Sequence, residues 1–347
     1  MKDNNRPILS ICIPTYNRGQ LLNKLLRQID TLNGATKSKI EICISDNYSS
    51  DSTEAVIDQW RIKLNLVAIR QKSNIGGSRN FQEVARLSTG KWMLLIGDDD
   101  LLCITGFENL IQLLNAFSSQ IWVLANILNP SGTTLLKNFS DGACSINEFK
   151  KRILVDSLDS LGFISSHLIP RKSIEKFVSL NIESIYGWPH LAMLFIDLEN
   201  VEIFVYKECI VKRGGDSGEV TQTWRPNDWL CLMMQKTKLC CYSEKGKNLF
   251  STSLALREYL RTEYAVQTLY SILYLKKKKI LFAQLNKYLN LTDIKKIAKY
   301  VIKLYVLILL LIPVKLISIL RSIKNPEAVI PEENIVNDLT DGMKRGL

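Results

Sequence analysis

Three consecutive aspartates, Asp98 to Asp100, closely follow a run of five apolar residues from Trp92 to Ile96. An apolar run of this length predicts a buried strand, so the carboxylates are expected at a strand end, where they repel one another. Carboxylates that do not form a complete protein cage are typical ligands of Mg²⁺ or Mn²⁺ shared with the phosphates of a substrate. We therefore predict a divalent cation held by Asp98, Asp99 and Asp100, with Asp99 as the main ligand, beside a substrate diphosphate.

The segments before this cluster alternate between strand and helix patterns. Strands are expected at residues 7–14, 40–47, 64–69 and 92–96. A first helix is expected at residues 19–29, and a second helix should begin near Asp51 and Glu54, which have the spacing of a capping box. A third helix should follow the glycine turn at residues 74–80. This alternation predicts a parallel sheet with crossover helices, whose ligands bind beyond the carboxyl ends of the strands. Thr15 and Asp46 also fall at strand ends. Polar residues at three separate ends indicate one shared site.

Two well-known nucleotide motifs are missing. The dinucleotide fingerprint G-x-G-x-x-G does not follow the first expected strand, and the phosphate loop G-x-x-x-x-G-K-[ST] is missing as well. The candidate site therefore lacks the two glycine-rich motifs by which many nucleotide-binding proteins hold phosphate groups.

Four motifs occur in order along the chain: ICIPTYNR (residues 11–18), EICISDNYSSDST (41–53), NIGGSRN (74–80) and LLIGDDDLL (94–102). Together they resemble the successive motifs of the family 2 glycosyltransferases, over about residues 7–125. The resemblance implies the GT-A fold, an α/β architecture in which a Rossmann-like mixed sheet is flanked by helices. It also implies a nucleotide-diphospho-sugar donor, a glycan acceptor, and Mg²⁺ or Mn²⁺ as cofactor.

The resemblance assigns a role to most of the candidate residues. Pro14, Thr15 and Asn17 would lie beside the nucleotide, Asp46 would hydrogen-bond its base, and the region of Asp98 would hold the ribose and the metal. The place of Arg79 in GGSRN favours a contact with the diphosphate. Each residue also has a structural alternative: Asp46 as a charge at a helix N-terminus, the three aspartates as a solvated turn that caps the next helix, Arg79 as a surface residue, and Thr15 and Asn17 as turn residues.

One position departs from the usual pattern of the family. Gly97 stands where many members have the first aspartate of the motif, so either Asp98 does more or the geometry shifts. A glycine at this place resembles the abequosyltransferase-like branch, which acts on deoxysugars of bacterial surface polysaccharides.

An inverting transfer also needs a base that takes the proton of the acceptor hydroxyl. The family usually presents a Glu-Asp pair at the start of a helix in the second half of the domain, and no such pair precedes an apolar helix here. His190, in the first turn of the helix predicted within SIYGWPHLAMLF (residues 184–195), is our first candidate, because histidine as a residue type suits general-base chemistry near neutral pH. Asp216, in the glycine-rich RGGDSG (residues 213–218), a segment expected to move as a lid, is the second. His190 could instead be a packed or exposed histidine, and His167 is predicted to be structural.

The positive charge of the chain is concentrated near its C-terminus. Residues 276–324 contain twelve Lys or Arg and one acid, Asp293. The net charge of this segment, +12 − 1 = +11, equals the formal net charge of the whole chain. The same region contains the apolar segment 300–321, whose charge-free core, residues 304–314, is shorter than the roughly 20 residues of a membrane span. We predict an interfacial helix on a membrane surface, with a spanning helix or a soluble core helix as alternatives. This favours a polyprenyl-linked glycan acceptor and argues against a nucleic-acid partner.

These observations give the expected domain organisation. Residues 1–245 would form the GT-A domain, with a nucleotide-sugar half (1–125) and an acceptor half (126–245). A basic, helical, membrane-associating extension (246–324) and a flexible tail (325–347) would follow. The start of the sequence lacks an apolar signal region, and the eight cysteines form no C-x-x-C pair, which favours reduced thiols and no structural zinc. The expected location is the cytoplasmic face of the inner membrane, with peripheral or monotopic attachment.

Two other classes of protein compete with this interpretation. The first is a catalytically inactive nucleotide-sugar-binding or scaffold protein of the same fold. The second is a nucleotidyltransferase, which would need a glycine-rich basic loop directly after the first strand. TYNRGQ, residues 15–20, matches such a loop poorly.

Overall fold

The computed structural model describes residues 6–214, except for residues 118–119, 138, 146–147, 150–158, 181–188 and 198–199, and a few positions between 300 and 311. The chain divides into two compact units, of which the first contains residues 1–223, 232–254 and 291–293. All the elements described below belong to this first unit. Asp216 and most of the predicted C-terminal extension and tail lie outside the described residues.

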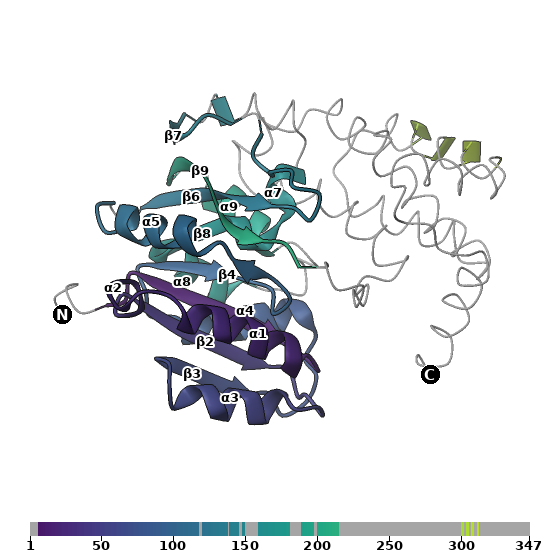
Figure 1. The fold of residues 1–347 in the computed structure, drawn as a ribbon. Helices are drawn as coiled ribbons and strands as arrows, with labels where there is room; N and C mark the ends of the chain where they lie inside the picture. Colours follow the sequence, from purple (N-terminus) through teal and green to yellow (C-terminus); the bar gives the residue numbers. More distant parts are fainter. Residues whose placement is uncertain are drawn as a thin grey trace. The chain divides into compact units, whose positions relative to one another are not determined.

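The N-terminal half forms the parallel part of one sheet (Figure 1). Its strands lie in the order β3-β2-β1-β4, with β1 at Leu9–Thr15, β2 at Ile40–Asp46, β3 at Leu66–Arg70 and β4 at Trp92–Leu95. The connections contain α1 (Gly19–Asp30), the short α2 (Gly34–Lys37), α3 (Thr53–Arg61) and α4 (Gly77–Leu87). The strands and helices predicted for this half are confirmed. All of β2 is buried because helices cover both faces of the sheet, and this explains its nearly continuous apolar sequence.

The second half makes the sheet mixed. Strand β8 (His167–Pro170) runs antiparallel between β4 and β6 (Ile121–Leu128), and β9 (Glu202–Lys212) runs parallel to β6. The short β5 (Leu101–Leu102) and β7 (Gly142–Cys144) both pair with β9 in antiparallel fashion. This arrangement brings the end of β9 back to the segment that follows β4, where the three aspartates lie.

Two apolar cores lie on the two faces of this sheet. Helices α1, α3 and α5 (Ile104–Leu114) cover one face, and α4, α8 (Arg171–Ser179) and α9 (Pro189–Asp197) cover the other (Figure 1). The remaining elements are α7 (Asp159–Gly162) and η2 (Ile164–Ser166). Cys12 and Cys43, neighbours in β1 and β2, are fully buried, as expected for core thiols. The predicted α/β mixed sheet flanked by helices is confirmed.

A buried carboxylate fixes the end of the sheet opposite the aspartates. Glu41, the second residue of β2, accepts hydrogen bonds from Ser10 Oγ at 2.6 Å, Thr89 N at 2.5 Å, Thr89 Oγ1 at 2.8 Å and Gly90 N at 3.1 Å. Arg171 donates to the carbonyl oxygens of Ser88 and Gly90 in the same turn. Glu41 therefore ties the α4–β4 turn to the first two strands.

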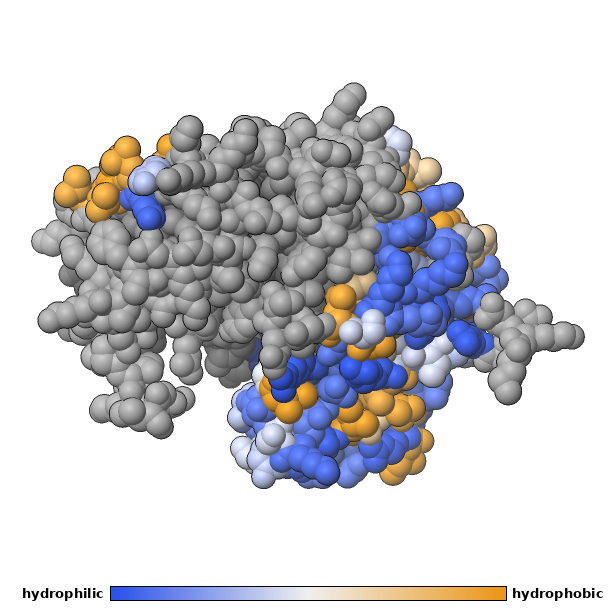
Figure 2. Space-filling view, turned by 180° about the vertical axis from the view of Figure 1, so that it is seen from behind, coloured by the Kyte–Doolittle hydropathy of each residue, from blue (hydrophilic) through white to orange (hydrophobic). Residues whose placement is uncertain are grey.

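The second unit has only a few described residues. The helical ones include Tyr300, Leu304 and Ile308, which are exposed and lie four residues apart, as on one face of a helix. Figure 2 colours the surface of the described residues by hydropathy and shows apolar groups among polar ones. In the part of the chain that the structure describes, no helix combines the length and apolarity needed to cross a bilayer.

Candidate functional site

The ends of the parallel strands bring the predicted polar residues together. Thr15 and Asp46 are the last residues of β1 and β2 and are paired in register. Asp46 is in turn paired with Arg70 at the end of β3, and Asn47 N donates to Thr15 O at 2.9 Å. The sequence prediction that separate strand ends form one polar edge is confirmed.

The segment Gly97–Asp100, here called the aspartate loop, meets β1 through Asp98. Asp98 is 3% exposed, and its Oδ2 accepts from Thr15 Oγ1 at 2.7 Å. Its Oδ1 accepts from Nη1 of Arg18 at 2.8 Å, and the same nitrogen lies 3.4 Å from Asp99 Oδ2. Burial raises the pKa of Asp98 above its usual value although Arg18 and Thr15 lower it. The cation beside these carboxylates in the structure is thus a guanidinium.

Asp100 has other partners than Asp98 and joins the aspartate loop to the second half of the domain. Its Oδ2 accepts from Ser165 Oγ at 2.8 Å and its Oδ1 from Gly214 N at 3.0 Å. Burial raises the pKa of Asp100 to about 7, although these two hydrogen bonds lower it. Both oxygens are occupied by internal donors, so this arrangement favours a positioning role for Asp100 over the predicted role of metal ligand.

Gly97 makes this arrangement of the aspartate loop possible. A Cβ atom at this position would lie 2.7 Å from Oδ1 of Asp99 and 3.2 Å from Oδ2 of Asp100. A larger residue would therefore displace the Asp99 side chain. In this chain the arrangement of the loop therefore favours glycine at position 97.

The loop fits a divalent cation that takes few ligands from the protein. Among the described residues, no group of three or more His, Cys, Asp or Glu is arranged to hold a metal ion. The side chain of Asp99 is 42% exposed, whereas that of Asp98 is 4% exposed. Mg²⁺ commonly binds through one or two carboxylates and completes its shell with water and substrate phosphates. Asp99 fits such a role, and Asp98 could join it only if Arg18 moved.

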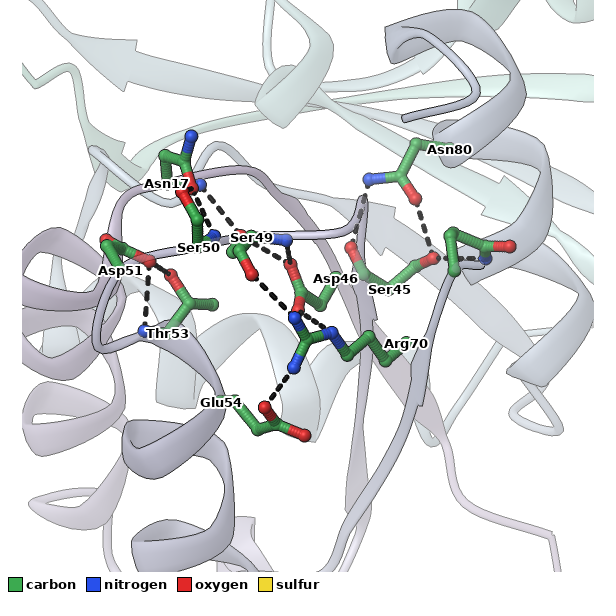
Figure 3. Close-up of polar contacts among 11 residues, drawn as sticks. Asn17, Ser45, Asp46, Ser49, Ser50, Asp51, Thr53, Glu54, Arg70 and Asn80 are labelled. Carbon is green, nitrogen blue, oxygen red and sulfur yellow. Dashed lines mark hydrogen bonds and ion pairs between the residues drawn. The ribbon is translucent and has the colours of Figure 1, made fainter. Parts of the chain in front are cut away.

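Asp46 is enclosed by the loop that follows β2 (Figure 3). It is 1% exposed, its Oδ1 accepts from Ser49 N at 3.0 Å, and its Oδ2 lies 3.6 Å from Arg70 Nε without a hydrogen bond. Arg70 also pairs with Glu54, so Glu54 does not complete the predicted capping box. The predicted hydrogen bond between Asp46 and the nucleobase of a donor would have to use Oδ2 of Asp46, which is buried in this structure.

Asn17 connects the loops after β1 and β2 (Figure 3). Its backbone has a φ of 52°, a conformation that asparagine tolerates, and its N–H donates to Ser49 Oγ at 2.8 Å. Its Oδ1 accepts from Ser50 N at 2.7 Å. Asn17 therefore ties the loop after β1 to the loop after β2, while Pro14 is a half-buried residue of β1. The predicted contacts of both residues with a nucleotide stay predictions.

Asp51 caps two helices at once, and Figure 3 shows its contact with one of them, at Thr53. Its Oδ2 accepts from the N–H of Gly19, the first residue of α1, at 2.9 Å, and its Oδ1 accepts from that of Thr53, the first residue of α3, at 3.0 Å. Gly19 leaves no room for a side chain here, because a Cβ would lie 2.8 Å from Thr53 N. The N-termini of α1 and α3 are thus fixed by one carboxylate.

We expect Asp51→Ala to lower the free energy of unfolding by about 1–2 kcal/mol, since two helix N-termini lose an acceptor. Burial raises the pKa of Asp51, but hydrogen bonds from Thr53 and Gly19 outweigh it and hold the pKa below its usual value. A depressed pKa stabilises the fold above the unfolded-state pKa of about 4, and this stabilisation is lost as the pH falls. Thermal unfolding should therefore show a difference between wild type and variant that shrinks below about pH 4. A difference that stays constant down to about pH 3 would contradict this explanation.

Arg79 lies exposed in the first turn of α4. The preceding turn contains Gly76 with a φ of 82° and is held by Asn47, whose Oδ1 accepts from Ile75 N at 2.9 Å. A helix N-terminus with a nearby arginine attracts an anion. The predicted contact of Arg79 with a diphosphate is compatible with this position and stays a prediction.

His190 lies at the start of α9, as predicted, but it is only 2% exposed. Its Nε2 is 3.2 Å from Leu161 O, and its ring lies 4.8 Å from that of His167. Trp122 Nε1, which can only donate, is 3.2 Å from Nδ1 of His167, so His167 Nε2 carries the proton and donates to Leu161 O at 2.8 Å. Burial lowers the pKa of His167 to about 4, in keeping with its predicted structural role. The base role of His190 stays a prediction that its burial does not favour.

We expect His190→Ala to lower the free energy of unfolding by about 2–4 kcal/mol, because it empties a buried site beside His167. Urea unfolding of the variant and initial rates of donor consumption would be measured together. A turnover rate reduced by roughly 10² to 10⁴ with normal stability and donor affinity would favour the base role instead.

Three residues of the site were missed from the sequence. Arg18 directly follows Asn17 within the motif ICIPTYNR, but an arginine in a turn usually has no partner that the sequence can reveal. Ser165 comes from a distant segment and has no local signal. Gly214 lies in the glycine-rich RGGDSG, which drew attention to Asp216 but not to Gly214 itself. A Cβ at Gly214 would lie 2.0 Å from Asp99 O, so a glycine is required for this close approach.

Comparison with known sequences finds a family profile and relatives that are named glycosyltransferases. The profile of the family described as Glycosyl transferase family 2 matches residues 10–176. An abequosyltransferase of Salmonella typhimurium, RfbV, is 43% identical over 97 residues, which are 27% of this chain and 29% of that protein. A Campylobacter jejuni protein described as GalNAc(5)-diNAcBac-PP-undecaprenol beta-1,3-glucosyltransferase is 29% identical over 204 residues, which are 57% of this chain and 62% of that protein. Each match covers less than two thirds of the relative's length.

Solved structures with the same fold include two with bound nucleotides. The TarS fragment 1–349 from S. aureus, in complex with UDP-GlcNAc, superimposes with a TM-score of 0.56 at 14% identity, over 76% of this chain and 79% of the fragment. The mannosyltransferase PcManGT from Pyrobaculum calidifontis, in complex with GDP-Man and Mn²⁺, gives a TM-score of 0.53 at 13% identity, over 88% and 86%. At these identities the similarity concerns the fold.

Proposed function

Because the profile of glycosyl transferase family 2 matches residues 10–176, we propose that the chain is a member of this family and transfers a sugar from a nucleotide-diphospho-sugar to a hydroxyl group of a glycan acceptor. The fold is the GT-A fold predicted from the sequence. The observation that supports the proposal most directly is the contact of Thr15 and Arg18 with Asp98. This contact joins the strand ends that would hold the nucleotide to the carboxylates that would face its phosphates.

The residues of the site divide the chemistry among them. Mg²⁺ or Mn²⁺ on Asp99 would stabilise the negative charge of the departing nucleoside diphosphate. Arg79 and the N-terminus of α4 would bind the same diphosphate, and the loop around Asp46 and Asn17 would orient the nucleoside. The acceptor hydroxyl would attack the anomeric carbon from the opposite side and invert its configuration. Its proton would pass to a base, for which His190 and Asp216 are the candidates.

The acceptor is proposed to be a lipid-linked glycan of a bacterial surface polysaccharide such as O-antigen or capsule. The name of the Campylobacter jejuni relative refers to an undecaprenol-linked acceptor. The name of the Salmonella typhimurium relative refers to abequose, a deoxysugar. Both names support the proposal, and neither fixes the sugar of this protein.

The test uses purified full-length protein and a panel of nucleotide sugars. Thermal shift identifies the donors that bind, and release of nucleoside diphosphate with and without Mn²⁺ measures their hydrolysis. One donor should both raise the melting temperature and be hydrolysed in a metal-dependent way. Binding without hydrolysis or transfer would favour the inactive sugar-nucleotide-binding protein, and no binding by any donor would overturn both proposals.

We further propose that the protein attaches to the cytoplasmic face of the inner membrane through residues 276–324. Two features support this attachment: the excess of basic residues in this segment, and the exposed apolar side chains of Tyr300, Leu304 and Ile308. Attraction to anionic lipid is worth about 1 kcal/mol per basic residue near the surface, and apolar burial adds to it. Full-length protein should sediment with anionic vesicles, be partly released at high salt, and sediment less after Leu304→Asp and Ile308→Asp. Protein that stays in the supernatant at low salt would refute the attachment.

A further inference from the structure

Arg18 has a position that its place in a turn does not predict. It is the N-cap residue of α1, and its side chain is only 20% exposed. Its Nη1 lies 2.8 Å from Oδ1 of Asp98 and 3.4 Å from Oδ2 of Asp99, so one nitrogen faces two carboxylates. Asp98 is fixed from the other side by Thr15, which keeps the pair in place.

The charges around Arg18 favour its staying there. Burial lowers the pKa of the guanidinium, but the carboxylates of Asp98, Asp99 and Asp100 raise it, and the carboxylates prevail. A positive charge between repelling carboxylates lowers the cost of bringing three of them into one loop. Arg18 therefore does what a bound cation would do for this loop.

A divalent cation would need the same space. A metal ion that bridges two carboxylate oxygens lies about 2.0–2.2 Å from each of them. Oδ1 of Asp98 and Oδ2 of Asp99 are the two oxygens that Nη1 already approaches. An ion between them would overlap with Nη1, and an ion on Asp99 alone would feel the repulsion of the guanidinium.

We infer that Arg18 is the resident counter-cation of the aspartate loop and competes with a divalent cation for Asp99. This inference rests on the proposed function, since it concerns the same carboxylates. It implies that the protein without nucleotide binds Mg²⁺ or Mn²⁺ weakly. It also implies that a diphosphate, as a new anion, would favour cation binding by drawing Arg18 from Asp99.

The test measures binding of Mn²⁺ alone to full-length protein without nucleotide, from the electron paramagnetic resonance signal of free Mn²⁺. Arg18→Met should tighten Mn²⁺ binding roughly tenfold, because a unit positive charge beside the ion is removed. Arg18→Lys keeps the charge and should bind Mn²⁺ nearly as weakly as wild type. The matched control is Arg27→Met, which removes the same charge from an exposed position in the last turn of the same helix and should change nothing.

A second substitution ties the effect to Asp99. Adding Asp99→Asn to Arg18→Met should remove the gained affinity. Equal or weaker Mn²⁺ binding by a folded Arg18→Met protein would overturn the inference, as would an equal gain in Arg27→Met. If circular dichroism shows that Arg18→Met is unfolded, Arg18→Gln, which keeps a hydrogen-bond donor without charge, replaces it with the same expectation. Mn²⁺ is the only probe, so failure here is separate from failure of donor hydrolysis, which would overturn the proposed function.

Discussion

Replacing Asp99 with asparagine is expected to reduce the rate of sugar transfer by roughly 10²–10³ while the protein stays folded. Asp99 has the exposed carboxylate of the aspartate loop, whereas Asp98 and Asp100 are held by internal donors. Asparagine keeps the shape of the side chain and removes the charge that would hold Mg²⁺ or Mn²⁺ beside the leaving diphosphate. The melting temperature should be unchanged or higher, because one repelling charge is lost. Initial rates at saturating donor and thermal unfolding are the measurements.

The matched control for this prediction is Asp58→Asn. Asp58 lies on α3 with a side chain that is 63% exposed, so the substitution makes the same change of charge away from the aspartate loop. It should leave the rate within experimental error of the wild type. Full activity of Asp99→Asn in the presence of EDTA would show that the metal prediction is wrong.

Replacing Glu41 with alanine is expected to lower the free energy of unfolding by about 3–5 kcal/mol. Four donors from Ser10, Thr89 and Gly90 point at this carboxylate, which is 7% exposed. Each buried donor left without an acceptor costs about 1–3 kcal/mol, offset in part by any water that enters. The α4–β4 turn would also lose its tie to β1 and β2. Urea unfolding measures the change.

Glu41→Gln is the informative companion of this variant. Its amide oxygen can still accept from Ser10, Thr89 and Gly90, and the Thr89 hydroxyl can reverse and accept from the amide nitrogen. The loss of stability should therefore be well below that of Glu41→Ala. A similar, small change in both variants would mean that the four hydrogen bonds contribute little to stability.

The parallel half of the sheet could be predicted from the sequence because its signals are local. The helix expected at residues 19–29 is α1, Gly19–Asp30, and the strand expected at residues 40–47 is β2, Ile40–Asp46. Apolar runs, a proline and glycine turns mark these boundaries within a few residues of chain. The meeting of Thr15 and Asp46 follows from the geometry of parallel strands.

The rest of the site depends on pairings that no local pattern specifies. The antiparallel insertion of β8 between β4 and β6 decides that Ser165 lies near Asp100, yet the sequence of β8 is a short apolar run like many others. The burial of His190 is also set by its neighbours His167 and Leu161, which come from other elements. Arg18 and Glu41 were missed for a related reason, because charged residues are usually solvated and their partners here are distant in sequence.

The contacts of Asp100 also bear on the order in which the nascent chain can complete this loop. Thr15 precedes its partner Asp98 by 83 residues. The two hydrogen-bond donors of Asp100 come later in the chain than Asp100 itself: Ser165 by 65 residues and Gly214 by 114 residues. Domains are made from the N-terminus at about 5–20 residues per second, so the parallel strands leave the ribosome seconds before β9 does. The loop therefore acquires its full set of contacts only after residue 214 has been translated. Asp98 can be held by Thr15 and Arg18 as soon as the parallel strands have formed, whereas Asp100 is fixed only in a chain that already contains the second half of the sheet.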